Sequence, residues 1–387
     1  MSARPSLPRN RLPIEPRRLR RSGEFAGYRQ SRPPPADPAP RRLDFFREPR
    51  WQVHPRLDRN ALDWLTFLAD PGSQMAQPSQ AMHWAQAAPL LAAATIHGVL
   101  PNVLRRLEKN GDAFDEPIDA KVILEHRGIL VQLAGHSLRL EHHGKIVMDA
   151  LAAAGMRAAV IKGPVFAARL YPDAALRPFS DLDILVDRSA RAQARPIMKK
   201  LGFRPSLQPS DDAVDHHEDQ WILPGASNLL IEVQDDLVHA PSFASRVTVG
   251  LDALSEAGDG DPTAATALLF SAAVHGALGH QFERLRFAID LCQASRGAAG
   301  AIDTDRLRRV AVRTRTLLPL VAGLDLVGRL FHEPAAIRMA EQLDRSALRA
   351  LCRRLWRSEM VLQAQGPARN AGAWRRKLAR EIFKRAV

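Results

Sequence analysis

The feature that most constrains the fold is an apolar run interrupted by two carboxylates, Asp-Leu-Asp-Ile-Leu-Val. Leu182, Ile184 and Val186 alternate with Asp181 and Asp183. An alternation of period two is typical of a β-strand with one face buried. Both aspartates therefore point to the same side, about 6.6 Å apart, because each residue of a strand rises about 3.3 Å. The run predicts a strand that presents a pair of carboxylates on one face of a sheet.

Two carboxylates this close together can bind one divalent cation or a pair of them. Two metal ions about 3.5 to 4 Å apart serve in-line displacement at phosphorus, where they stabilise both the attacking and the leaving oxygen. A motif this short also occurs by chance, and taken alone it is more often a solvated strand face than a metal site. Its neighbours in the sequence decide between the two interpretations.

The segments on either side of the aspartate pair supply a turn and a third carboxylate. Ala158-Ala-Val-Ile-Lys-Gly-Pro-Val165 predicts a short buried strand that ends in a Gly-Pro break. Pro164 suits the first turn of a helix, and Gly163 lets backbone approach a ligand closely. Asn228-Leu-Leu-Ile-Glu-Val-Gln234 predicts another strand with Glu232 in its middle. Three carboxylates, a glycine turn and nearby basic residues form a coherent site for a cation and a phosphate.

Three motifs in this region resemble the uncharacterised nucleotidyltransferase family of the DNA polymerase beta superfamily. They are Ile161-Lys-Gly, Leu170-Tyr-Pro and the run from Arg177 through the aspartate strand to Val186. Members carry a Lys-Gly turn, an arginine just ahead of an Asp-x-Asp strand and a third acidic residue on a later strand. The match extends from about Arg157 to Val238, with weaker similarity at Ile96-His-Gly-Val99 and from Arg284 to Asp290.

The resemblance implies a Mg²⁺-dependent enzyme that moves a nucleoside monophosphate from an NTP to an acceptor hydroxyl or phosphate. The implied catalytic and metal-binding residues are Asp181, Asp183 and Glu232. The residues implied to bind nucleotide and phosphate are Lys162, Gly163, Arg177 and Ser180. The base and the acceptor stay open at this point, as does the oligomeric state.

Two positions depart from the pattern of the superfamily. Pro164 follows Gly163 where other members have a Gly-Ser or Gly-Gly turn shortly before the aspartate pair, and the gap to Asp181 is 18 positions. Gln234 stands where many relatives carry a histidine. Because fold does not guarantee activity, these departures motivate a second hypothesis. It is a binding protein that keeps the nucleotidyltransferase fold without catalysing.

The net charge of +13 is concentrated at the beginning of the chain. Residues 1–50 hold 13 Arg against 5 acidic residues, together with 10 of the 28 prolines. Few large apolar residues occur there, so the segment is predicted to be disordered. An Arg-rich arm could bind nucleic acid in a salt-sensitive way. The favoured interpretation is a solvated tail or an extension from an upstream start codon, because blocks of like charge are often simply disordered.

Amphipathic patterns flank the mixed segment on both sides and predict helices before Ala153 and from Pro262 onward. The sequence therefore predicts an α+β protein, with a small mixed nucleotidyltransferase-type β-sheet flanked by N-terminal and C-terminal helical regions. The predicted divisions are a tail at 1–50, a helical region at 51–155, a nucleotidyltransferase core at 156–240 and a second helical region at 241–387.

Several finer predictions concern single elements. Ser189 is predicted to cap a helix that ends near Gly202. Asp215-His-His-Glu-Asp219 is interpreted as a polar lead-in to the strand Gln220-Trp-Ile-Leu223, which is predicted to pair with the strand that carries Glu232. His275 and Asp290 are weaker candidates for substrate contact, and a core-lining role is favoured for both. His275 and His280 are five residues apart, which separates them on an α-helix.

Composition and motif searches exclude several classes of protein. No apolar window is long enough to span a bilayer, and no apolar stretch of a secretory signal follows the basic residues of the N-terminus. Cys292 and Cys352 form neither a disulfide framework nor a Cys-x-x-Cys pair, so reducing cytoplasm is the predicted compartment. The motifs of serine hydrolases, P-loop NTPases and dinucleotide enzymes do not occur.

Overall fold

The computed structural model describes residues 57–206, 217–225, 229–244, 246–362 and 373–386. The helical segments that precede the sheet are α1 (Arg59–Ala69), η1 (Trp84–Gln86), α2 (Ala87–Ile96), α3 (Leu100–Leu107) and α4 (Ala120–Ala153). Aspartates begin the first and last of them. The Asp58 carboxylate accepts a hydrogen bond from the Ala61 amide, and the Asp119 carboxylate accepts one from the Lys121 amide, each at 2.8 Å. Such caps satisfy amides that have no partner within the helix.

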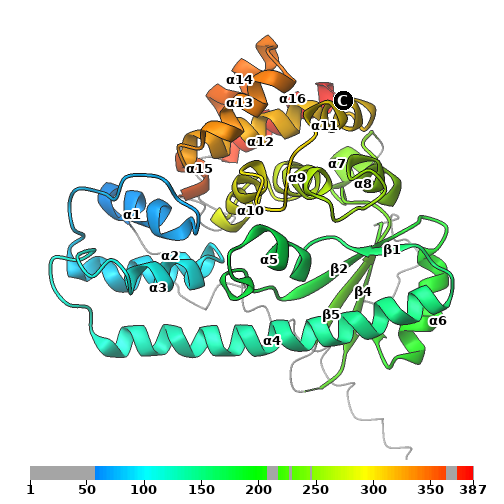
Figure 1. Ribbon diagram of the computed structural model, residues 1–387, viewed down its shortest axis with the longest axis horizontal. Helices are drawn as coiled ribbons and strands as arrows, with labels where there is room; N and C mark the ends of the chain where they lie inside the picture. Colours follow the sequence, from blue (N-terminus) through cyan, green and yellow to red (C-terminus); the bar gives the residue numbers. More distant parts are fainter. Residues whose placement is uncertain (1–56, 207–216, 226–228, 245, 363–372, 387) are drawn as a thin grey trace, which may run out of the picture. The chain divides into compact units, whose positions relative to one another are not determined.

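A mixed sheet follows (Figure 1), and the spatial order of its strands is β1-β2-β5-β4-β3. Its strands are β1 (Ala158–Val160), β2 (Asp181–Val186), β3 (Arg204–Pro205), β4 (Glu218–Leu223) and β5 (Leu229–Gln234). The aspartate strand β2 lies parallel to β5 and antiparallel to β1. β4 pairs with β5 in antiparallel fashion, so the predicted pairing of these two strands is confirmed. The predicted α+β class with helices on both sides of a mixed sheet is also confirmed.

The two faces of the sheet contact different helices. On one face, Leu182, Ile184 and Val186 of β2 share a core with residues of α4 and of α6 (Arg191–Lys200). Gly144 permits the close approach of α4, because a Cβ atom there would lie 2.3 Å from Leu182 Cδ2. On the other face, Leu185 joins the larger core, which includes residues of the C-terminal helices. Figure 1 shows α8 and α9 on the opposite side of the sheet from α4. The alternation in the sequence therefore directs the aspartates of β2 toward the face that the C-terminal helices cover.

Short helical segments connect the first strands. α5 (Pro164–Leu170) and η2 (Ala174–Leu176) lead from β1 to β2, and Pro164 occupies the first turn of α5 as predicted. The prediction for Ser189 is wrong, because the residue that precedes the first turn of α6 is Ala190 and no side chain caps this helix. The turn after β2 instead closes through a backbone bond from the Ala190 amide to the Asp187 carbonyl oxygen, 2.8 Å long.

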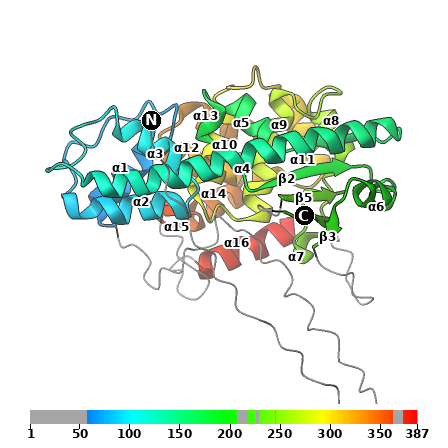
Figure 2. The ribbon, with the colours of Figure 1, turned by 90° about the horizontal axis from the view of Figure 1, so that it is seen from below.

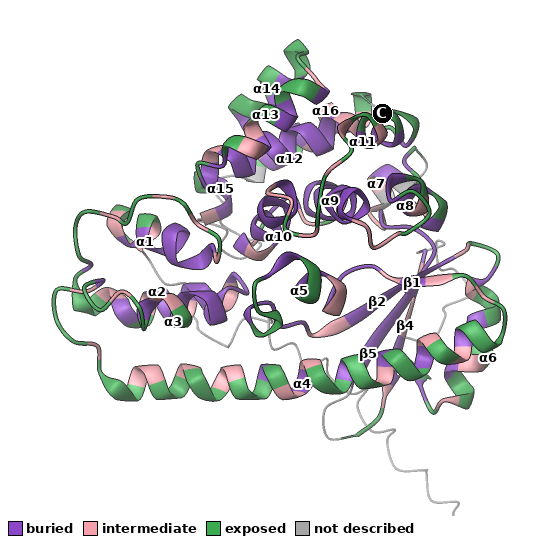
Figure 3. Ribbon diagram, in the orientation of Figure 1, coloured by how far each residue is buried: buried purple, intermediate pink, exposed green. Residues whose placement is uncertain are grey.

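The remainder of the described chain is helical. Its elements are α7 (Pro241–Ala244), α8 (Leu251–Ala257), α9 (Ala265–Val274), the π-helical turn η3 (His275–Gly279), α10 (Leu285–Ser295), α11 (Thr304–Arg313), α12 (Leu317–Leu330), α13 (Pro334–Leu343), α14 (Ala347–Leu355), α15 (Ser358–Leu362) and α16 (Ala373–Ala386). α9 and α12 are apolar on nearly all sides and are buried almost throughout (Figure 3). No helix within the described ranges has the length and apolar character that a bilayer crossing needs.

Two parts of the sequence analysis fall outside the described residues. They are the Arg- and Pro-rich segment 1–50 and the first part of the polar lead-in to β4, including His216. The division of the chain at 50, 155 and 240 and the cytoplasmic location stay predictions.

Candidate active site

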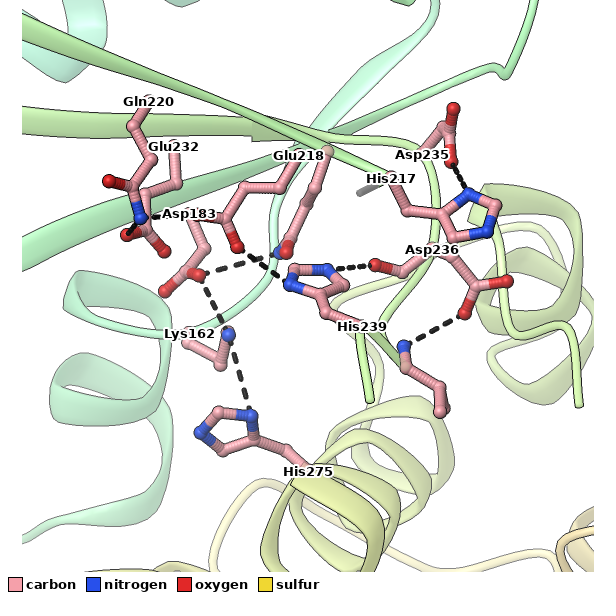
Figure 4. A network of polar contacts seen from close by, with 12 residues as sticks. Lys162, Asp183, His217, Glu218, Gln220, Glu232, Asp235, Asp236, His239 and His275 are labelled. Atoms are coloured by element: carbon pink, nitrogen blue, oxygen red, sulfur yellow. Dashed lines mark hydrogen bonds and ion pairs between the residues drawn. The ribbon is translucent and has the colours of Figure 1, made fainter. Parts of the chain in front are cut away.

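The candidate site is built on a row of polar side chains that crosses three strands. Asp183 of β2 is the register partner of Glu232 of β5, and Glu232 is in turn the partner of Gln220 of β4. Residues in register across a sheet project to the same face. The Gln220 amide nitrogen donates to Glu232 Oε1 at 3.0 Å (Figure 4). The pairing of strands thus brings together two of the predicted catalytic carboxylates and one amide that the sequence analysis did not assign.

The two carboxylates of this row lie close to a third, that of Asp181, and all three are at least partly buried. Asp183 and Glu232 are buried, and Asp181, at the first position of β2, is half-buried. Burial raises the pKa of Glu232 well above its usual range, and the charges of Asp183 and Asp181 raise it further. Burial and the nearby Asp183 likewise raise the pKa of Asp181. The folded chain therefore holds a concentration of negative charge that a bound cation would relieve.

Lys162 supplies one positive charge to this cluster. Its ammonium nitrogen lies 2.7 Å from Asp183 Oδ1, and its side chain is 10% exposed (Figure 4). The Ile161 amide donates to the Asp183 carbonyl oxygen at 3.2 Å, which fixes the lysine beside β2. Burial alone would lower the pKa of Lys162, but the attraction of Asp183, Glu232 and Asp181 raises it above the usual value. The lysine therefore stays charged and neutralises Asp183.

Gly163 and Arg177 meet on the other side of the Lys-Gly turn. Gly163 has φ 51° and ψ −116°, a conformation that glycine adopts without strain, and its carbonyl oxygen lies 3.5 Å from Arg177 Nη1. The Arg177 guanidinium also binds both carboxylate oxygens of Asp290, each at 2.8 Å, and Tyr171 donates to the same carboxylate at 2.8 Å. Asp290 thus balances the charge of Arg177, and the resulting buried ion pair ties α10 to the turn.

Ser180 enters the site through its backbone. His136 Nε2 of α4 lies 3.1 Å from the Ser180 carbonyl oxygen, and this nitrogen carries the hydrogen because a carbonyl oxygen only accepts. The neighbouring Ser137 hydroxyl donates to the Phe179 carbonyl oxygen and accepts from the Phe179 amide, both at 3.1 Å. α4 thereby positions the two residues that immediately precede Asp181.

The π-helical turn η3 brings two histidines together that the sequence analysis had separated. The His280 amide donates to the His275 carbonyl oxygen at 3.2 Å, and the two ring centroids are 4.7 Å apart. The expectation that a spacing of five separates them was wrong, because a π-helical bond joins residues five apart. His275 Nδ1 lies 3.5 Å from the Lys162 ammonium nitrogen. Burial, with the charge of Lys162, lowers the pKa of His275 well below its usual value, so the ring is neutral.

Arg286 is a basic residue of the site that the sequence analysis missed. Burial lowers its pKa to about 10, and the attraction of Asp181 opposes that shift. The positive charge of Arg286 in turn lowers the pKa of Asp181, which burial and Asp183 raise. A signal existed, since Arg286 falls within the segment from Arg284 to Asp290 that shows the weaker similarity. Its role depends on how close α10 lies to Asp181, which no local pattern indicates.

A second set of polar contacts lies beside the row. Gln220 also donates to Glu218 at 2.6 Å, and Glu218 pairs with His239 Nδ1 at 2.6 Å (Figure 4). Burial would raise the pKa of Glu218, but the hydrogen bond and charge of His239 lower it. Gln234, at the position where relatives carry histidine, donates to Asp183 Oδ1 at 3.4 Å. Each buried carboxylate of the row thus accepts a hydrogen bond from a side-chain amide, Glu232 from Gln220 and Asp183 from Gln234.

The oxygen atoms of the site are of the chemical type that binds a divalent cation. Carboxylate oxygens are the ligands that Mg²⁺ prefers, and Asp181, Asp183 and Glu232 carry more negative charge than Lys162 alone offsets. In the part of the chain that the structure describes, no group of three or more His, Cys, Asp and Glu side chains is arranged to hold a metal ion. The ammonium of Lys162 is the cation that contacts Asp183.

Comparison with known proteins identifies the family of this chain. Residues 84–332, well over half of the chain, match a protein family described as an uncharacterised nucleotidyltransferase. No curated protein and no solved structure matches the chain. The matched segment contains the whole sheet and all of the residues named above for the site. The chain therefore belongs to the uncharacterised nucleotidyltransferase family.

Proposed function

We propose that this nucleotidyltransferase transfers a nucleoside monophosphate from an NTP to an acceptor hydroxyl or phosphate and releases pyrophosphate. The observation that carries the proposal is the pairing of Asp183 with Glu232 on one sheet face, beside Asp181 and Lys162. In the reaction the acceptor oxygen forms a bond to the α-phosphorus. The bond from that phosphorus to the bridging oxygen of pyrophosphate breaks. Positioning and charge stabilisation account for most of the catalysis in such transfers.

Asp181 and the residues of the row would have distinct roles. Asp181, Asp183 and Glu232 would hold Mg²⁺, which supplies positive charge to the triphosphate oxygens. Glu232 would take the proton of the acceptor, a role that its raised pKa favours because a general base works best near the ambient pH. The Gln220 amide orients Glu232 through the bond to Oε1.

Basic residues around the row would bind the triphosphate. Lys162, whose ammonium lies 2.7 Å from Asp183 Oδ1, would neutralise charge on a phosphate oxygen once Asp183 serves as a metal ligand. Arg286 adds a second positive charge near Asp181. Arg177 would position the Lys-Gly turn, because its guanidinium contacts the Gly163 carbonyl oxygen. Asp290 balances the charge of this guanidinium. Ser180 would border the triphosphate together with Gly163.

A label-transfer experiment tests the proposal. Wild type and the Asp181→Asn/Asp183→Asn variant are incubated with each α-³²P-labelled NTP and Mg²⁺ in cell extract. We expect label to move to an acceptor with wild type and not with the variant. The labelled product then identifies the acceptor and the base. If the protein binds NTP but no label moves with any nucleotide, the proposed transfer is wrong.

A second candidate function is NTP binding without catalysis. The observation that favours it is that Lys162 and Gln234 both contact Asp183 Oδ1, so one of the two carboxylate oxygens that could bind a metal ion already faces two hydrogen-bond donors. Such a binder would keep its NTP affinity when Asp183 is replaced by Asn, whereas a metal-dependent enzyme would lose activity. The Arg-rich segment 1–50, which underlies the nucleic-acid alternative, lies outside the described residues.

Glu232→Gln is expected to stabilise the protein at pH 8 when divalent cations are absent. A carboxyl group whose pKa is raised on folding adds stability that is fully present below its unfolded pKa of about 4.5. That stability is lost as the pH rises through the raised folded-state value. Glutamine keeps the acceptor for Gln220 without the charge. We expect a gain of about 0.5 to 2 kcal/mol in the free energy of unfolding, measured by urea denaturation in EDTA.

The gain from Glu232→Gln should shrink as the pH is lowered toward 4.5, where the wild-type carboxyl is protonated. Stabilisation by added Mg²⁺ should be weaker in the variant than in wild type. The matched control is Glu381→Gln, since the pKa of that exposed carboxylate is lowered by its hydrogen bond to Lys384. A loss of stability in Glu232→Gln at pH 8 would contradict the crowding of charge inferred here.

A further inference from the structure

The long helix α4 has a second face that points away from the sheet. Leu124, Val131 and Leu138 are 69%, 73% and 67% exposed, although helix residues of this type are usually buried. They are seven residues apart, so they form one stripe along α4, which crosses the view from below in Figure 2. Figure 3 shows exposed residues along the same helix. A heptad stripe of this kind is the pattern of a helix that pairs with another helix.

Two glycines complete the stripe. Gly128 and Gly135 lie between the apolar residues, which gives the 3-and-4 spacing of the a and d positions in a coiled coil. A Cβ atom at Gly128 would meet nothing within 4 Å, and one at Gly135 would meet only the Arg139 side chain at 3.7 Å. Each glycine costs about 0.5 to 1 kcal/mol in a helix interior. The described residues contain no packing reason for either glycine, whereas a second helix would use the space.

The charges beside the stripe distinguish between possible partners. One flank carries Glu125 and Arg139, and the other carries Arg127 and Glu141. In an antiparallel pair of identical helices, each flank faces the same flank of the second copy. With a two-fold axis near residue 133, Glu125 faces Arg139 and Arg127 faces Glu141. The symmetry repeats both contacts, so every charged flank residue meets the opposite charge.

A parallel arrangement lacks this match. In a parallel pair, a residue of one flank faces the residue five positions later in the second copy. Arg127 would then face Gln132, and Glu141 would face Ile146. In the antiparallel register, two of the three large side chains of the stripe also meet glycines: Leu138 lies opposite Gly128, and Val131 lies opposite Gly135, while Leu124 lies opposite His142. Leucine over glycine permits the close approach of two helices.

We propose that the chain forms a homodimer in which α4 pairs in antiparallel fashion with α4 of a second copy. The contact is isologous, with the same patch used on both subunits around a two-fold axis. Arg127 already contacts Glu108 of its own chain at 2.6 Å, but both side chains are 56% exposed. A surface ion pair of this kind contributes about 0 to 1 kcal/mol, so it yields readily to a second partner.

The dimer would also bear on the site described above. His136 and Ser137, which hold the Phe179–Ser180 segment, lie within the same part of α4 as Leu138. Pairing of two α4 helices would stiffen the helix that positions the beginning of β2. The proposal goes beyond the proposed function and does not depend on it, because association is measured without substrate.

Sedimentation velocity of the full-length chain with paired charge reversals tests the inference. Wild type is expected to be a dimer at micromolar concentration. Glu125→Arg or Arg139→Glu alone places like charges opposite each other, so each should weaken the dimer at least about tenfold. The double variant restores opposite charges and should return the dissociation constant to within about threefold of wild type. Val131→Glu should give a monomer with an unchanged circular dichroism spectrum.

Charge reversal at Arg338, an exposed residue of α13, is the matched control and should leave association unchanged. A wild type that is monomeric at about 50 μM overturns the proposal, whether the stripe is then solvated or covered by another segment of the same chain. A dimer that is insensitive to all of the α4 variants overturns it equally. Failure of the double variant to restore association would show that the antiparallel register is wrong.

Discussion

Asp183→Asn is expected to lower the rate of nucleotidyl transfer about a thousandfold or more, with little change in fold. Asp183 lies at the centre of the polar row, where it contacts Lys162 and is the register partner of Glu232. Asparagine keeps the size of the side chain but removes the charge that would hold a divalent cation. A loss of about 4 kcal/mol of transition-state stabilisation corresponds to about a thousandfold in rate. Initial rates with labelled NTP at saturating Mg²⁺ measure the effect.

Asp187→Asn is the matched control for this substitution. Asp187 directly follows the same strand, but its carboxylate is 31% exposed and pairs with Arg157 at 3.4 Å. We expect the control to change the rate less than threefold. Thermal unfolding of both variants separates a catalytic effect from misfolding. We expect Asp183→Asn to stay folded, because the charges of Glu232 and Asp181 still act on Lys162. An Asp183→Asn enzyme within tenfold of wild type would remove this residue from the catalytic machinery.

The sequence predicted those parts of the site that depend on local pattern. Alternation of apolar and acidic residues located β2 within its observed bounds, Asp181–Val186. The Gly-Pro break located the first turn of α5. Helical periodicity located the second helical region, predicted from Pro262 onward, in which α9 begins at Ala265. Each of these elements follows from side-chain periodicity or from backbone restrictions on glycine and proline, which are properties of a few adjacent residues.

The remaining contacts of the site depend on how distant segments meet. Gln220 faces Glu232 only because β4 lies beside β5 in a particular register. Arg286 acts on Asp181 only because packing of the core brings the first turn of α10 near the first residue of β2. The meeting of His275 and His280 required a π-helical turn, which has no distinctive sequence pattern. Strand order, helix docking and helix type are decided by the whole core, so a linear reading of the sequence could not specify them.

Asp290→Ala is expected to lower the free energy of unfolding by about 3 to 5 kcal/mol. Arg177 and Asp290 form a buried pair with two hydrogen bonds of 2.8 Å, and their side chains are 9% and 2% exposed. Removal of one partner leaves a buried charge without compensation, which costs about that much. Tyr171 also loses the acceptor of its hydroxyl. Denaturation in urea, followed by circular dichroism, measures the change.

The matched control is another buried ion pair with two hydrogen bonds, Asp325 of α12 with Arg349 of α14. Its two hydrogen bonds are 2.8 and 2.9 Å long, and Asp325 is 2% exposed. Asp325→Ala should destabilise the protein to a similar extent without changing NTP affinity. Asp290→Ala should lower both, because Arg177 contacts the Gly163 carbonyl oxygen in the Lys-Gly turn. Equal NTP affinity in the two variants would show that the Arg177–Asp290 pair stabilises the fold without positioning the turn.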